Sequence, residues 1–271
     1  MRSEKPVFIL GVGAQKSGTS WFCQQLQKSP QIDMGAHKEY HVWDKVYAHE
    51  LRLSERVEPK PDKETAHMAL QRLMRTHEGT YEAYFKGLIR NQIICTGDIT
   101  PIYATLNPSH FEEVQSKLTR AGFRVTVVFL MRDPAERLWS AMRMFLRKYG
   151  PIDGAKTQRE LFSRFGDFMQ ETGNVARTRY DLTVTTLRRV FDEEDLFFGL
   201  YEEMFTDAFA GALSEFLGVS LPVWNADHLV DDHDALPLPD EQYCACRAQY
   251  QMVYDFCAEQ FPATTLLWRR A

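Results

Sequence analysis

Short apolar runs alternate along the chain with segments in which apolar residues recur at helical spacing. The first run, near the N-terminus, has no polar interruption, which is typical of a strand buried on both faces of a sheet. The pattern predicts strands at residues 5–12, 92–96, 124–131 and 196–200. It predicts helices at residues 19–29, 111–121, 133–148, 208–217 and 240–260, with stop signals at Pro30, Gly122 and Gly218.

Strands that alternate with helices indicate an α/β fold, in which a mainly parallel central sheet is covered by helices on both faces. Residues 46–80 and 149–180 fit this alternation less well, because they are polar and charged with only patches of helical pattern. We expect helical insertions at about residues 45–90 and 149–182, over the carboxyl edge of the sheet, where open α/β folds bind ligands. The chain has no internal repeat, so we expect a single domain over residues 1–271.

Composition and charge narrow the function classes. Of the 271 residues, 44% are hydrophobic and 13% aromatic, far too many for a disordered protein. The net charge of −5 argues against sequence-independent binding of nucleic acid, although it is compatible with one buried basic pocket for a small anion. No apolar run approaches the roughly 18 residues that span a bilayer, and the N-terminal run lacks a signal-peptide cleavage site. We therefore expect a cytoplasmic protein with no membrane partner.

The cysteines predict reduced thiols. They are five in number, and Cys244-x-Cys246 has no matching second pair, so the spacing does not favour a zinc site.

The residues after the first predicted strand have the spacing of a phosphate-binding loop: Gly13-Ala14-Gln15-Lys16-Ser17-Gly18-Thr19-Ser20. The lysine lies inside the loop, whereas an ATP-binding loop places it directly after the second glycine. Glycines let backbone N–H groups point inward, the following helix adds partial positive charge at its N-terminus, and the polar side chains add donors. The alternative is a plain strand-to-helix turn with a solvated lysine. The crowding of polar donors favours an anion site.

A second candidate anion site follows the predicted strand at residues 124–131. Arg132 lies at the carboxyl end of this strand, and Ser140 lies on the helix that follows. An arginine and a serine placed in this way can hold a phosphate. Asp133, Pro134 and Glu136 are explained by helix initiation alone, as N-cap, first helical residue and capping-box partner. The alternative is a surface arginine with a serine that faces the core.

Together these segments resemble a known family. Residues 15–21 resemble the 5′-phosphosulfate loop of sulfotransferases that use 3′-phosphoadenosine 5′-phosphosulfate (PAPS), and residues 132–140 resemble their 3′-phosphate motif. Residues 38–44 are similar to the Lys-Glu-x-His-Phe-Phe-Asp segment of heparan-sulfate-type and related bacterial enzymes, and residues 97–103 to their Glu-Lys-Ser/Thr-Pro-x-Tyr segment. The resemblance extends from Pro6 to about Gly218. It implies a P-loop-NTPase-like fold and a PAPS-dependent sulfotransferase.

The resemblance also implies roles for individual residues. Glu39 is the general base that takes the proton of the acceptor hydroxyl, and Lys16 is the cation on the bridging oxygen, with Ser17 holding Lys16 until the acceptor arrives. The residues implied to bind the cofactor are Gln15, Lys16, Ser17, Gly18, Thr19, Ser20, Arg132 and Ser140. The residues implied on the acceptor side are His41, Asp98 and Thr100. The family works without a metal, so none is expected.

Alternatives to these roles stay open. Glu39 can instead be a solvated carboxylate beside Lys38, a surface pair worth little. His37 and His41 are other candidate bases. Asp98 and Thr100 can line the acceptor pocket or only cap a turn.

The chain also departs from the family in two places. Ile99 stands where the heparan-type enzymes carry a lysine. Residues 227–234 are acidic where many relatives place a basic loop over the cofactor.

Two other functions compete with sulfuryl transfer. A P-loop kinase would use Lys16 on an ATP phosphate and Asp133 as a magnesium ligand, but ATP has no 3′-phosphate for Arg132 and Ser140 to bind. A non-catalytic nucleotide-binding protein of the same fold would be expected to lack Lys16 or Glu39, and both are present. The likeness favours a carbohydrate or small-molecule acceptor in a bacterial enzyme.

Overall fold

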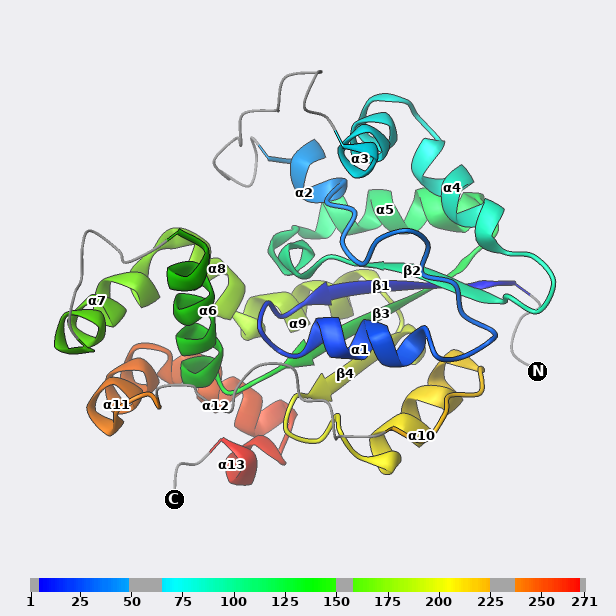
Figure 1. Cartoon of the computed structure of the whole chain (residues 1–271). Helices are drawn as coiled ribbons and strands as arrows, with labels where there is room; N and C mark the ends of the chain where they lie inside the picture. Colours follow the sequence, from blue (N-terminus) through cyan, green and yellow to red (C-terminus); the bar gives the residue numbers. More distant parts are fainter. Residues whose placement is uncertain (1–4, 49–64, 150–157, 225–236, 269–271) are drawn as a thin grey trace.

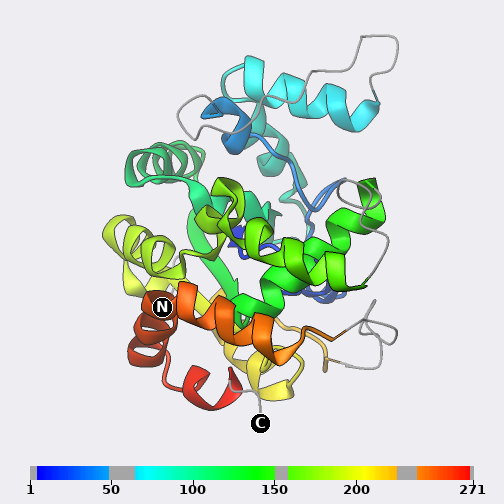
Figure 2. The ribbon, with the colours of Figure 1, turned by 90° about the vertical axis from the view of Figure 1, so that its left-hand side faces the viewer.

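The centre of the computed structural model, which describes residues 5–48, 65–149, 158–224 and 237–268, is a parallel sheet of four strands (Figure 1). In chain order the strands are β1 (Val7–Gly13), β2 (Cys95–Ile99), β3 (Arg124–Met131) and β4 (Leu196–Leu200). Their order in the sheet is β2-β1-β3-β4, so that Val7 is level with Cys95 on one side and with Arg124 on the other. All four strands run the same way, and their carboxyl ends therefore meet at one edge of the sheet, which faces the viewer in Figure 2.

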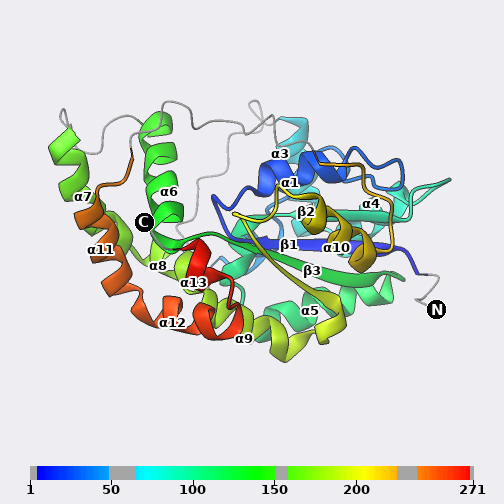
Figure 3. The same ribbon diagram turned by 90° about the horizontal axis from the view of Figure 1, so that it is seen from below.

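Helices cover both faces of this sheet because successive side chains of a strand point to opposite sides. Phe8 and Leu10 of β1 belong to one buried cluster and Ile9 to the other. The first cluster includes side chains of α5 (Pro108–Arg120), α9 (Tyr180–Val190) and α12 (Gln251–Gln260), and the second includes those of α1 (Thr19–Leu26) and α10 (Asp207–Leu217). Figure 3 shows these two sets of helices on opposite sides of the sheet. The predicted three-layer α/β arrangement is confirmed.

A group of helices packs beyond the carboxyl ends of the strands: α6 (Pro134–Tyr149), α7 (Gln158–Gln170), α8 (Thr172–Thr178) and α11 (Asp240–Gln249). A second group lies near α5: α2 (Trp43–Val46), α3 (Ala66–Thr76) and α4 (Thr80–Leu88). The remaining helices are short: η2 (Pro101–Thr105), η4 (Glu193–Asp195) and α13 (Thr264–Leu267). Within the described ranges, no helix is long and apolar enough to cross a membrane.

β2 lies three residues later than the sequence predicts, at Cys95–Ile99. Gly97 and Asp98 resemble turn residues in the sequence, yet both are strand residues in the structure. A side chain at Gly97 would collide with the carbonyl of Ile9 in β1, so the close approach of the two strands requires glycine there. Asp98 is tolerated because its buried carboxylate is hydrogen-bonded, as described below.

The predicted last helix is in fact two, α11 and α12, with a break at Tyr250. The two halves pack on different elements, since α11 contacts α6 and α7 whereas α12 contacts α9. The hydroxyl of Tyr250 donates to the carbonyl of Met169 in α7, at 2.5 Å, and ties the break to that group.

The described parts of the two predicted insertions are helical, with α2, α3 and α4 in the first and α7 and α8 in the second. Residues 49–64 and 150–157 lie outside the described residues, as does the acidic stretch at 227–234. The assignment of the whole chain to one domain stays a prediction.

Candidate active site

The loop after β1 leads into α1 with an open, positive helix end. Lys16 and Gly18 both adopt the left-handed conformation, with φ of 71° and 74°, and a Cβ atom at Gly18 would collide with Met204. Among the described residues, no side chain caps the N-terminus of α1, and its first turn contains no acidic residue. Its first N–H groups therefore carry uncompensated partial positive charge, which suits an anion.

Ser17 is a fully buried polar residue of this loop. It is 0% exposed, and its Oγ has no hydrogen-bond partner within the described residues. A buried hydroxyl left without a partner costs free energy, which a ligand that bonds to it would recover. Gln15 and Lys16 beside it are half-buried.

Arg132 brings the two predicted anion motifs together. Its Nη1 donates to the carbonyl oxygen of Lys16, at 3.4 Å, so the end of β3 contacts the loop after β1. The central carbon of its guanidinium lies over the ring of Tyr201, 4.3 Å from the ring centre, in a cation–π contact at the end of β4. Ser140 lies farther along α6 and is nearly buried. The two motifs were predicted separately from the sequence, and the structure places Arg132 of the second beside the loop of the first.

Asp133 starts α6, as the sequence predicts. Its Oδ1 accepts from the N–H of Ala135 at 2.8 Å and of Glu136 at 3.3 Å. The hydroxyls of Tyr243 and Tyr254 donate to the same carboxylate, each at 2.8 Å. The N–H of Asp133 donates to a carboxylate oxygen of Glu202 at 3.3 Å. The Asp133 carboxylate is fully engaged in holding the helix.

Arg137, between Arg132 and Ser140 in sequence, is part of the core. It is 0% exposed, and its Nη2 donates to the Thr178 hydroxyl at 2.6 Å and the Asn174 carbonyl at 3.4 Å. Burial lowers the pKa of its guanidinium. Arg137 therefore fastens α6 to α8 behind the candidate site.

A cavity of about 220 Å³ lies beside Arg132. Its lining comes from the ends of β3 and β4, the start of α6 and the C-terminal helices: Arg132, Asp133, Glu136, Tyr201, Glu202, Tyr243, Leu267 and Trp268. The contributions of Tyr243 and Trp268 were not predicted, because nothing in the local sequence around them indicates a site.

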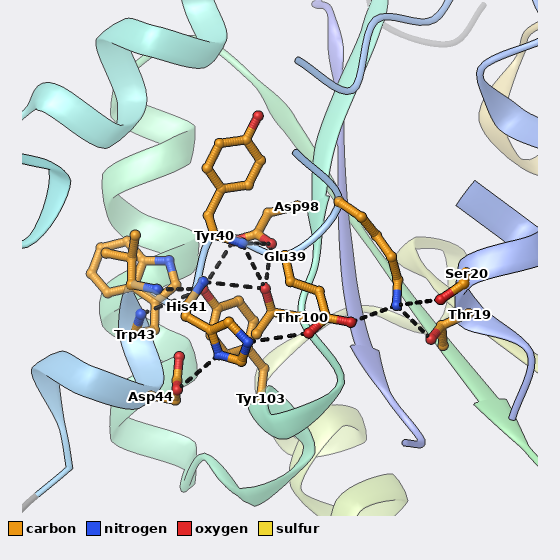
Figure 4. Close-up of polar contacts among 12 residues, drawn as sticks. Thr19, Ser20, Glu39, Tyr40, His41, Trp43, Asp44, Asp98, Thr100 and Tyr103 are labelled. Atoms are coloured by element: carbon orange, nitrogen blue, oxygen red, sulfur yellow. Dashed lines mark hydrogen bonds and ion pairs between the residues drawn. The ribbon is translucent and has the colours of Figure 1, made fainter. Parts of the chain in front are cut away.

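The candidate base, Glu39, is held between two cations (Figure 4). Lys38 Nζ lies 2.6 Å from Oε1, and His41 Nε2 lies 3.1 Å from Oε2. The other ring nitrogen of His41 lies 3.1 Å from Asp44 Oδ2. His41 reaches both carboxylates from a left-handed backbone, with φ of 51°. Asp44 was not among the predicted site residues, although its place in the similar segment was a signal.

These contacts shift the pKa values of the pair in opposite directions. Burial alone would raise the pKa of Glu39, but the hydrogen bonds and charges of His41 and Lys38 outweigh it and lower the pKa to about 2. Burial would lower the pKa of His41, but its bonds to Asp44 and Glu39 raise it to about 9. At neutral pH, therefore, Glu39 is a carboxylate and His41 an imidazolium.

Asp98 and Thr100 support this loop from beneath and have no exposed surface. Asp98 accepts from the hydroxyls of Thr100 at 2.6 Å, Tyr103 at 2.9 Å and Tyr81 at 3.0 Å, and from the N–H of Tyr40 at 3.3 Å. The Thr100 hydroxyl in turn accepts from the N–H of Tyr40, at 3.1 Å. Both side chains thus lie buried beneath the loop that carries Glu39, and their predicted roles, lining the acceptor pocket or capping a turn, stay predictions.

Lys38 connects this loop to α1. Its ammonium also donates to the hydroxyls of Thr19 at 3.0 Å and Ser20 at 3.2 Å. The structure thus brings the anion loop, Arg132, Glu39 and His41 to one edge of the sheet, whereas Asp98 and Thr100 lie behind it.

A family model described as the sulfotransferase family matches residues 6–222, most of the chain. The chain belongs to the sulfotransferase family. The matched range contains every predicted site residue, from Gln15 to Ser140, and nearly coincides with the range of resemblance drawn from the motifs. Among curated protein sequences, none matches significantly.

Solved sulfotransferase structures share the fold of this sulfotransferase. One from Alicyclobacillus acidocaldarius is 21% identical with a TM-score of 0.60, over 99% of this chain and 98% of that one. Sulfotransferase STF9 from Mycobacterium avium is 14% identical with a TM-score of 0.50, over 96% and 77%. Likeness at this identity shows the P-loop-NTPase-like fold of sulfotransferases. The nearer similarity to the heparan-sulfate type stays a prediction.

The sulfotransferase should lose stability as the pH rises through about 9, because His41 loses its proton there. Its pKa is raised above the ordinary 6.5, so the stabilising contribution of the imidazolium is fully present below about 6.5 and is lost as the pH passes 9. Thermal midpoints between pH 6 and 10 check this expectation. The difference between wild type and His41→Asn should be largest at low pH and shrink above 9, whereas exposed His77→Asn serves as the control. A difference that is independent of pH would contradict the assignment.

Proposed function

We propose that this sulfotransferase moves the sulfuryl group of PAPS to an acceptor hydroxyl, with Glu39 as the general base. The observation that carries the proposal is the hydrogen bond from Arg132 to the Lys16 carbonyl. It joins two motifs that are far apart in sequence, one suited to a 5′-phosphosulfate and one to a 3′-phosphate.

The residues present fit PAPS. Within the described residues, the Ser17 hydroxyl has no hydrogen-bond partner and no side chain caps the N-terminus of α1. An anion bound on the loop would accept hydrogen bonds from both. The 5′-phosphosulfate would be held by the residues of the loop: Gln15, Lys16, Ser17, Gly18, Thr19 and Ser20. Arg132 and Ser140 would hold the 3′-phosphate, where the guanidinium offers a planar pair of donors.

The chain's own residues then have distinct tasks. When bound, PAPS supplies the sulfuryl group and a phosphate leaving group. Glu39 accepts the proton of the acceptor hydroxyl, since its carboxylate is ionised and about one third of its side chain is exposed. Lys16 and the N–H groups of α1 provide positive charge where negative charge grows on the leaving oxygen. Ser17, next to Lys16 in the loop, can hold the lysine until the acceptor arrives.

Glu39 is a better candidate for the base than His41. Both ring nitrogens of His41 are engaged, one by Glu39 and one by Asp44, and the pKa of about 9 keeps the ring protonated. A protonated ring cannot take a proton. His41 therefore positions Glu39, and Asp44 positions His41.

The contacts of Asp133 count against the kinase alternative. Asp133 is the carboxylate that would hold the metal, and the two tyrosine hydroxyls and two backbone N–H groups described above occupy it. The acceptor, a carbohydrate or small molecule, and the cytoplasmic bacterial setting stay predictions from the sequence.

Binding of 3′-phosphoadenosine 5′-phosphate (PAP), the product nucleotide, tests the proposal. At a hundredfold excess over its dissociation constant, PAP should stabilise the protein by about 2.7 kcal/mol and raise the thermal midpoint by roughly 5–10 °C, whereas AMP and ATP–magnesium should not. Arg132→Ala should weaken PAP binding by roughly 10- to 100-fold, because a charged hydrogen-bond donor is lost.

Arg124→Ala is the matched control for this test. Arg124 lies at the other end of the same strand, is similarly buried, and pairs with Asp195 at 2.7 Å. Its removal should leave the shift with PAP unchanged. A midpoint that rises with ATP–magnesium and not with PAP would overturn the proposed donor.

A further inference from the structure

Lys38 occupies a junction between three parts of the site. Its ammonium donates to Thr19 and Ser20 of α1 and pairs with Glu39 at 2.6 Å, so each of its three N–H groups has a partner. Its own carbonyl accepts from the N–H of Ile99 at 3.0 Å, which fixes the backbone of Lys38 to the end of β2. The side chain is 20% exposed, so the ammonium lies mostly inside the structure.

The electrostatic setting of this ammonium is unusual. It lies at the N-terminus of α1, where the helix dipole is positive and a cation is disfavoured. Glu39 is the carboxylate that compensates it among the described residues. An anion bound at the loop would present negative charge at the same two hydroxyls and would compete with Glu39 for the ammonium.

We propose that Lys38 is a positioning residue that couples occupation of the anion loop to release of the Glu39 carboxylate. In the free protein the ammonium holds Glu39. When an anion lies on Thr19 and Ser20, the ammonium shifts toward it and Glu39 keeps only His41. The base is thereby strengthened when the donor is in place. This inference rests on the proposed function, because the loop must bind the nucleotide.

The groups that face Glu39 identify Lys38 as the link. Lys38 and His41 flank it on its own segment, with Asp44 behind His41, and Cys23 of α1 and Asp98 of β2 lie nearby. Burial raises the pKa of Cys23 to about 11 and keeps it neutral. The carboxylate of Asp98 is buried beneath the loop and already accepts the hydrogen bonds described above. Lys38 is the member of this set that bonds both to Glu39 and to the hydroxyls of Thr19 and Ser20 in α1.

The pKa of Glu39 measured by carboxyl NMR on the full chain, with and without PAP, tests the coupling. In the free protein, Lys38→Met should raise this pKa by about one to three pH units, because one opposite charge is removed. PAP should raise it in the wild type by a comparable amount. In Lys38→Met, PAP should raise it much less, since only the direct repulsion of the bound phosphate remains. The difference between the two responses measures the coupling.

Matched variants separate this role from a structural one. Lys117→Met removes an ammonium of similar exposure, 21%, that lies 3.6 Å from Glu113 on α5, and it should leave the pKa of Glu39 and its response to PAP unchanged. Lys38→Arg keeps the charge and should restore most of the response. Circular dichroism verifies that each variant is folded, and Lys38→Gln repeats the test with a polar side chain.

Two results would overturn the inference in different ways. If PAP binds and raises the pKa of Glu39 equally in wild type and Lys38→Met, the loop and the base are not coupled through Lys38, and the proposed function survives. If PAP fails to bind the wild type at all, the proposed function fails first and the coupling with it.

Discussion

Replacing Glu39 by glutamine is expected to lower the rate of sulfuryl transfer by roughly 100- to 10,000-fold, while PAP still binds. Glutamine has the shape of glutamate but cannot take a proton from the acceptor. The nucleotide contacts assigned to Ser17, Arg132 and Ser140 do not involve Glu39. Glutamine also removes the carboxylate that competes with the nucleotide for Lys38, so PAP should bind at least as tightly as it does to the wild type. The measurement is release of PAP from PAPS, with acceptors drawn from simple sugars and phenols, beside calorimetry of PAP binding.

The amide should also disturb its neighbour. One oxygen of Glu39 faces His41 and the other faces Lys38, both donors, whereas an amide offers a single oxygen. The pKa of His41 should therefore fall from about 9 in Glu39→Gln. Glu113→Gln, which neutralises a carboxylate paired with Lys117 on α5, is the control and should turn over normally. Wild-type turnover by Glu39→Gln would remove Glu39 from the role of base.

Replacing Asp98 by alanine should destabilise the fold by about 4 kcal/mol, roughly a 10 °C fall in thermal midpoint. The change leaves the buried hydroxyls of Tyr81, Tyr103 and Thr100 without their common acceptor, and it frees the backbone that carries Glu39. Asp98→Asn should also destabilise, because its amide would turn a donor toward donors. Thermal and denaturant unfolding give the comparison.

Asp181→Ala is the control for this comparison. That carboxylate is also mostly buried, but it pairs with Arg179, whose side chain is 27% exposed, so its loss should cost less than the loss of Asp98. An effect of Asp98→Ala no larger than that of Asp181→Ala would show that the buried network contributes little.

Asp98 should also leave a signature in the pH dependence of stability. Burial raises its pKa to about 6, so the folded protein binds this proton more tightly than the unfolded chain does. Stability should therefore rise as the pH falls from about 6 toward the ordinary value of 3.8, because the folded protein takes up this proton first. This is the opposite of the behaviour expected for Glu39, whose lowered pKa makes its contribution disappear in acid.

Elements with a strong local signal could be predicted from the sequence. β3 and β4 have their predicted bounds because each is a dense apolar run between clear stop signals. The anion loop and Arg132 were found for a related reason, since each follows directly on such a run and strand ends collect at one edge of a parallel sheet. Their contact through the Lys16 carbonyl is a consequence of β1 and β3 being neighbours.

The parts that could not be predicted depend on contacts distant in sequence. Asp98 accepts hydrogen bonds from Tyr81 of α4 and Tyr103 of η2. The sequence around Asp98 gives no sign of these two partners. The bonds from Lys38 to Thr19 and Ser20 likewise join segments that only the folded chain brings together. The break at Tyr250 arises because the two halves of one periodic segment pack on different helices.

The position of β1 has a consequence for how the chain folds. β1 is synthesised before both of its neighbours in the sheet, β2 and β3, which begin at Cys95 and Arg124. Its entirely apolar face therefore stays without a partner until long after it leaves the ribosome, and closure of the sheet awaits slow long-range pairing. We expect nascent chains that end before β2 to need chaperones and to aggregate readily without them. A C-terminal truncation that removes β2 and β3 leaves β1 without either neighbour, and it is therefore a poor route to a smaller working protein.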